Sequence, residues 1–115
     1  MFDWYGAGDA QILRLSVQVS APCSMNTQVN LDGKNLASLS GPTKEPITIP
    51  GNPQDLPLAG KILSISSMLA FLPSVPSTPR VSYVLEGGIE GRRSFEPEPT
   101  QTEIGFDVML RLRFN

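Results

Sequence analysis

The feature that most constrains the fold is an alternation of apolar residues near the C-terminal end of the sequence. From residue 104 to residue 114, apolar side chains occupy every second position: Ile104, Phe106, Val108, Leu110, Leu112 and Phe114. Successive side chains of a strand point to opposite faces of a sheet, so this period of two predicts a half-buried strand. Such a strand needs paired neighbours and a covered apolar face, because an open apolar edge aggregates. The sequence therefore predicts a β protein.

Shorter alternations earlier in the chain predict further strands. Residues 13–19 and 81–85 each alternate, and Pro46 and Pro50 confine the strand between them to a sheet edge. The apolar phases of these runs give a predicted core of Leu13, Leu15, Val17, Val19, Val29, Leu31, Ile47, Ile49, Ile62, Val81, Tyr83, Leu85, Phe106, Val108, Leu110 and Leu112.

Turn signals set the expected architecture. Asp32-Gly33 predicts a two-residue hairpin turn, and residues 66–72 predict one short helix that begins at a serine cap and ends before Pro73. Eleven prolines and ten glycines in 115 residues leave no room for long helices. We expect an all-β fold, an antiparallel β-sandwich of the immunoglobulin or fibronectin III type, with six to seven strands.

The N-terminal residues differ from the rest of the chain because they are aromatic and then glycine-rich, with no strand period. We expect residues 1–10 to form a flexible arm and residues 11–115 to form the sandwich domain. The arm should dock its large apolar side chains on the domain's own sheet or, slightly favoured, on a neighbouring subunit. Arg111 and Arg113 fit either a solvated face that discourages edge pairing or a docking stripe for an acidic partner. The predicted partner-binding residues are Phe2, Trp4, Tyr5, Arg111 and Arg113.

Composition argues against several kinds of chemistry. The chain has no histidine, so Ser-His-Asp and Cys-His catalysis are excluded, and the single cysteine, Cys23, allows no intrachain disulfide. Glu86 with Glu90, and Glu96 with Glu98, are the remaining carboxylate pairs, and we expect them to be solvated. The sequence predicts a protein that is not an enzyme, with no catalytic residue, no metal site and no cofactor.

Charge and hydropathy limit the partners. Nine basic residues stand against eleven acidic ones, for a net charge of −2, and they form no basic patch that would bind nucleic acid. No apolar run reaches the length of a transmembrane helix. We expect a protein partner or self-association, with no nucleic acid bound.

The order of features resembles the water-stress and hypersensitive-response (WHy) domain of the group 2 late embryogenesis abundant proteins. The matching segments span the first strand to Glu98 and include residues 31–37, 47–51, 69–72 and 81–89. The resemblance implies a seven-stranded sandwich like fibronectin type III, with a polar hairpin turn, a short helix and no enzymatic activity. Members of that family are tied to desiccation stress in plants and in bacteria are often exported lipoproteins.

Two functions remain open at this point. The first is a non-enzymatic binding or stress-related module, which would be periplasmic or envelope-associated if a leader upstream of Met1 was removed. The alternative is a structural subunit of a virion, pilus or secretion assembly that associates through strand edges and its N-terminal arm. Without a removed leader, the compartment would be the virion or the cytoplasm.

Overall fold

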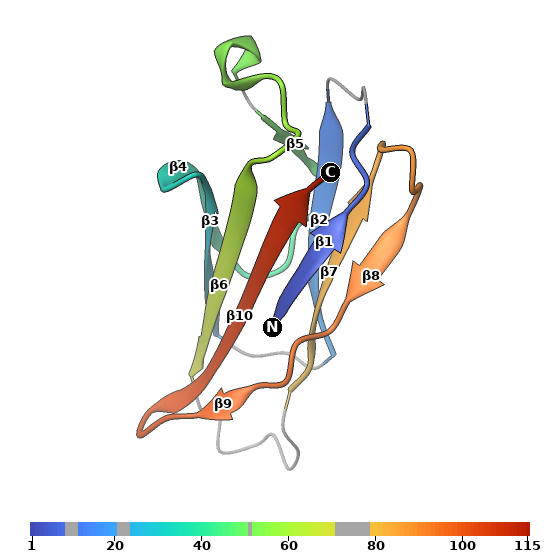
Figure 1. The fold of residues 1–115 in the computed structure, drawn as a ribbon. Helices are drawn as coiled ribbons and strands as arrows, with labels where there is room; N and C mark the ends of the chain where they lie inside the picture. Colours follow the sequence, from blue (N-terminus) through green and yellow to red (C-terminus); the bar gives the residue numbers. More distant parts are fainter. Residues whose placement is uncertain (9–11, 21–23, 51, 71–78) are drawn as a thin grey trace.

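The computed structural model describes residues 1–8, 12–20, 24–50, 52–70 and 79–115 as two facing β-sheets, so the predicted all-β sandwich is confirmed (Figure 1). The described part contains ten strands rather than six to seven, because several short edge strands carry no readable alternation. They are β1 (Phe2–Tyr5), β2 (Leu13–Val19), β3 (Met25–Leu31), β4 (Lys34–Ser40), β5 (Ile47–Ile49), β6 (Ile62–Ala70), β7 (Val81–Glu86), β8 (Arg93–Phe95), β9 (Thr100–Gln101) and β10 (Gly105–Phe114). A 3-10 turn spans Pro53–Asp55.

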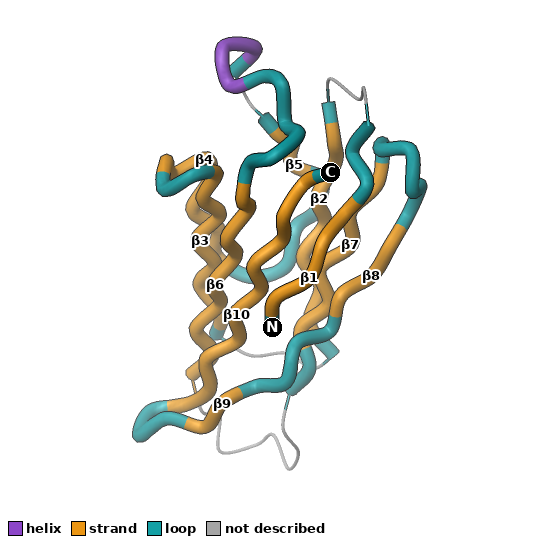
Figure 2. The backbone as a smooth tube through the Cα atoms, in the orientation of Figure 1, coloured by secondary structure: helices purple, strands orange, loops and turns teal. Residues whose placement is uncertain are grey.

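The two sheets divide the strands unequally. The larger sheet has the order β1-β10-β6-β3-β4, with β9 also paired to β10, and the smaller sheet has the order β5-β2-β7-β8. Figure 2 shows that strands make up most of the traced backbone and that loops gather at the two ends. The C-terminal strand β10 lies inside the larger sheet, between β1 and β6, so its backbone is paired on both sides. Its apolar face packs into the core between the two sheets.

Several local predictions are confirmed. Asp32 and Gly33 both have positive φ, 48° and 81°, and join β3 to β4 as the two-residue hairpin turn requires. The proline-flanked strand β5 is one of the two edge strands of the smaller sheet.

The predicted helix over residues 66–72 is wrong where the structure describes it. Residues 66–70 belong to β6, which pairs with β10 on one side and β3 on the other. Inward positions are Leu63, Ile65, Ser67 and Leu69, so the apolar phase lies one residue away from the predicted Ile62, which is half-buried. The polar residue inside the apolar phase, Ser67, hides the period of two. Residues 71 and 72, like Cys23, lie outside the described residues.

The core fills the space between the sheets and contains most of the predicted residues. Val19, Ile47, Ile62 and Phe106 are only partly buried. The buried residues that were not predicted from the sequence are Tyr5, Ala7, Met25, Leu58, Leu63, Ile65, Leu69, Val84, Phe95 and Phe114. Leu63, Ile65 and Leu69 lie on β6, where Ser67 interrupts the apolar phase, and Tyr5 and Phe95 lie on strands that are too short to show a period.

A chain of buried hydroxyl groups connects the two sheets through this core. Thr27 on β3 and Ser67 on β6 share a hydrogen bond of 2.7 Å, and Ser67 shares a second, of 2.5 Å, with the phenol of Tyr83 on β7. All three side chains are fully buried. Each hydroxyl is therefore satisfied inside the protein, which avoids the cost of burying an unpaired polar group.

Burial makes this hydroxyl chain sensitive to alkaline pH. Burial raises the pKa of Tyr83 from 10.0 to about 12, against an opposing effect of the Ser67 hydrogen bond. Folding keeps the phenol neutral, and the resulting stabilisation is fully present below the pKa of the unfolded state. This stabilisation of roughly 2 to 3 kcal/mol is lost as the pH rises from about 10 through 12. We expect Tyr83→Phe to lose less unfolding free energy than the wild type over this range, as measured by urea unfolding at several pH values.

Tyr5 serves as the internal comparison for this experiment, because burial also raises its pKa. The Tyr83→Phe protein should therefore still lose some unfolding free energy at alkaline pH, though less than the wild type. Adding Tyr5→Phe should reduce this remaining loss. Identical pH profiles for Tyr83→Phe and the wild type would contradict the prediction.

Candidate functional site

The N-terminal residues form a strand rather than a free arm. β1 runs parallel to β10 in the same molecule, with Phe2 opposite Arg111 and Trp4 opposite Arg113, as the blue and red strands of Figure 1 show. The slightly favoured expectation of docking on a neighbouring subunit therefore differs from the structure, in which the segment docks on the domain's own sheet. A parallel pairing between residues more than a hundred positions apart leaves no local sequence signal.

Tyr5 anchors β1 in the core and is therefore not a surface residue. Its side chain is fully buried and contacts Phe114 edge to face, with ring centroids 6.4 Å apart. Its hydroxyl donates to the Gly91 carbonyl and accepts from the Gly88 N–H at 3.1 Å. A side chain at Gly88 would overlap the tyrosine ring, since an added Cβ would lie 2.6 Å from its Cε1 atom. The prediction that Tyr5 contacts a partner is thus not supported by its position.

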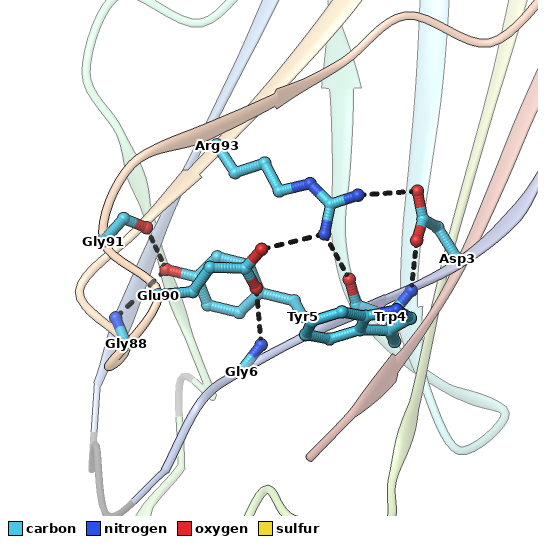
Figure 3. A network of polar contacts seen from close by, with 8 residues as sticks. All are labelled: Asp3, Trp4, Tyr5, Gly6, Gly88, Glu90, Gly91 and Arg93. Carbon is cyan, nitrogen blue, oxygen red and sulfur yellow. Dashed lines mark hydrogen bonds and ion pairs between the residues drawn. The ribbon is translucent and has the colours of Figure 1, made fainter.

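Arg93 closes the free edge of β1 (Figure 3). Its guanidinium donates to the Trp4 carbonyl at 2.9 Å and forms ion pairs of 2.9 Å with both Asp3 and Glu90. The N–H of Trp4 donates to Asp3 at 2.8 Å, and the N–H of Gly6 donates to Glu90 at 2.8 Å. Side chains of the same molecule therefore occupy the N–H and carbonyl of Trp4 and the N–H of Gly6, which are among the backbone groups that an added strand would need.

The remaining sheet edges are also poor templates for an added strand. β4 has a register shift opposite Val29 and Asn30, which is the mark of a bulge. β5 and β8 are three residues long, and prolines flank β5. Short, bulged and proline-bounded edges are the features that proteins use against edge-to-edge association.

The outer face of the larger sheet, by contrast, is open. The pairing register places its outward side chains in rows across the strands: Trp4, Arg113 and Ile62; Phe2, Arg111, Ser64, Asn30 and Asn35; Met109, Ser66, Gln28 and Ser38; and Asp107, Met68, Asn26 and Ser40. We call this surface the larger-sheet face. Neighbouring strands are about 4.8 Å apart, so five strands span about 19 Å.

One half of the larger-sheet face is a preorganised array of amides and hydroxyls. Asn35 donates to the side-chain oxygens of Gln28 at 2.9 Å and Asn30 at 3.1 Å, and Ser38 and Ser40 donate to Gln28 at 2.8 Å and Asn26 at 3.3 Å. The side-chain oxygens of the β3 amides are therefore used within the molecule. Their NH₂ groups remain as hydrogen-bond donors on the surface.

The other half of the larger-sheet face carries exposed apolar and cationic groups. Phe2 is 64% exposed, Trp4 51%, Met68 55% and Met109 56%. Aromatic residues, methionine and arginine are the types enriched in protein interfaces, whereas lysine, glutamate and aspartate are depleted there. Asp107 is the one acidic residue in the rows described above.

The structure thus brings four of the five predicted partner-binding residues together, namely Phe2, Trp4, Arg111 and Arg113. The amide array was not predicted from the sequence, although a readable signal was present. Asn26, Gln28 and Asn30 alternate with buried residues along β3, which is a polar phase of period two.

A small hollow lies at one end of the larger-sheet face. Its volume is about 120 Å³, and it is lined by Ser24, Asn26, Met68, Leu69, Ala70, Thr102, Ile104, Phe106 and Asp107. Small-molecule sites are usually of roughly 300 to 1,000 Å³, so this hollow fits a side chain better than a substrate.

The candidate carboxylate pairs have other roles in the structure. Glu90 holds Gly6 and Arg93 at the β1 edge, and Glu96 accepts a hydrogen bond from Ser82 at 3.0 Å. Among the residues that the structure describes, no three histidine, cysteine or acidic side chains gather where a metal ion could bind. The described ranges also include no helix that is long and apolar enough to cross a membrane.

Comparison with protein-family models, with curated proteins and with solved structures gives no match to the chain in any of the three. The larger-sheet face itself is therefore the basis on which a function is inferred.

Proposed function

We propose that this chain is a non-enzymatic β-sandwich module that binds a macromolecular partner through the larger-sheet face. The observation that carries the proposal is the gathering of Phe2, Trp4, Met68 and Met109 with two arginines on one sheet face. A stable protein interface takes about 800 Å² from each partner, and a five-stranded face is of that order. The resemblance to the WHy domain is compatible with such a module and remains a prediction.

The blocked edges support this proposal over the alternative of a structural subunit that assembles by strand addition. β1 is capped by side chains, and β4, β5 and β8 are bulged or short. Strand addition needs a row of open backbone groups, whereas face binding needs only an exposed, complementary surface.

We expect partner capture from the source cells to depend on Met109. It lies near the middle of the larger-sheet face and is 56% exposed, so Met109→Glu should leave the fold intact and place a charge inside the interface. Gln18→Glu is the matched control, because Gln18 is an exposed strand residue on the smaller sheet. Proteins retained by the wild type and by Gln18→Glu should be lost with Met109→Glu, as quantified by mass spectrometry.

The same set of captured proteins for all three variants would contradict the proposal. Light scattering on the purified proteins provides the second readout. A monomer is expected, and a ring or polymer would favour the assembly subunit instead.

A further inference from the structure

Arg111 and Arg113 differ from the other arginine of this region in having no side-chain partner among the described residues. Arg93 uses its guanidinium for two ion pairs and a backbone carbonyl, and it stacks on two aromatic rings. Arg111 and Arg113 are exposed, and within the described residues neither forms an ion pair or a side-chain hydrogen bond. Two guanidinium groups therefore remain available to a ligand.

The strand fixes the spacing of these two groups. They are at alternate positions of β10, so they lie on the same face with their Cα atoms about 6.8 Å apart. Phe2 and Trp4 flank them on β1, and Ser64 and Ile62 flank them on β6. The site therefore consists of two guanidinium groups in a line along β10, with aromatic side chains of β1 on one side and the smaller side chains of Ser64 and Ile62 on the other.

An extended peptide repeats the same distance. Side chains at alternate positions of an extended chain point to one face about 6.8 Å apart. Carboxylates in an acid-x-acid pattern therefore match Arg111 and Arg113 one to one, and arginine binds carboxylates through two parallel hydrogen bonds. The larger-sheet face adds amide donors from β3 and contributes one acidic group, Asp107, so its charge favours an anionic ligand.

We propose that Arg111 and Arg113, together with Phe2 and Trp4, bind an extended acidic segment of a protein partner that carries carboxylates at alternate positions. This inference rests on the proposed function and specifies the chemistry of the ligand for the same face.

The test is fluorescence anisotropy with labelled synthetic peptides at low ionic strength. We expect the peptide Glu-Ser-Glu-Ser-Glu-Ser-Ser to bind about threefold more tightly than Glu-Ser-Ser-Glu-Ser-Ser-Glu, which has the same composition without the alternate spacing. The Arg111→Gln and Arg113→Gln double variant should raise the Kd about tenfold, as expected for the loss of two exposed charge pairs. Added salt should weaken the wild-type complex because both ions are solvated.

Arg14→Gln with Arg80→Gln is the matched control, since it removes two exposed arginines away from the larger-sheet face. An unchanged Kd for the Arg111 and Arg113 variant, or an equal loss with the control variant, would overturn the proposal. Tighter binding of an oligogalacturonate than of the peptide would also overturn it, because the site would then be selective for a carbohydrate.

The failure of this inference can be told apart from the failure of the proposed function. If neither peptide binds while capture still depends on Met109, the acidic ligand is wrong and the larger-sheet face remains a binding site. If capture does not depend on Met109, the proposed function itself fails.

Discussion

Replacing Tyr5 with alanine should lower the free energy of unfolding by about 4 kcal/mol, the usual range for truncating a fully buried aromatic side chain. The variant loses the contact with Phe114, and it loses both hydrogen bonds of the phenol. Because Tyr5 is the buried anchor of β1, the loss should release this strand from β10. Urea unfolding followed by circular dichroism measures the first effect, and amide hydrogen exchange at residues 3, 5 and 7 measures the second.

Phe2→Ala is the control on the same strand, because Phe2 is 64% exposed and its loss should change the unfolding free energy by about 0.5 kcal/mol or less. Tyr5→Phe separates the hydroxyl from the ring and should cost about 1 kcal/mol. Equal effects of Tyr5→Ala and Phe2→Ala would show that β1 is not anchored through Tyr5.

Truncating Leu110 to alanine should cost about 2 to 4 kcal/mol, because its side chain is fully buried in the centre of β10. For a domain of this size the melting temperature should fall by about 10 °C. The adjacent Met109 lies on the opposite face and is 56% exposed, so Met109→Ala should be close to neutral. Differential scanning calorimetry on the two variants tests the predicted facing of the strand. Similar melting temperatures would mean that the alternation does not distinguish core from surface.

How well an element could be predicted depended on its length and on the purity of its alternation. β10 is ten residues long, and from Val108 to Phe114 every inward position is apolar, with Met109 the one apolar residue in the outward phase, so its facing could be read directly. β6 is almost as long, yet a serine occupies an inward position, where Thr27 and Tyr83 satisfy its hydroxyl. The hydrogen bonds that make Ser67 acceptable in the core come from distant strands. A local pattern therefore could not reveal them.

The candidate site was predicted in part for the same reason. The exposed phase of β10 identified Arg111 and Arg113, and the unusual aromatic start identified Phe2 and Trp4. Tyr5 was grouped with them because four strand residues are too few to show which side chains point inward. Its burial follows from Gly88 and Phe114, which come together only in the folded chain.

The parallel pairing of β1 with β10 also determines the order in which the molecule can be completed on the ribosome. β1 is synthesised before every other strand, and its partner β10 follows all the strands of both sheets. β1 therefore has no partner strand while the hairpin of β3 and β4 and the strands of the smaller sheet are synthesised. Closing such a long loop is slow and entropically costly compared with local pairing. The nascent chain thus carries Trp4 and Tyr5 without their partner strand for most of its synthesis.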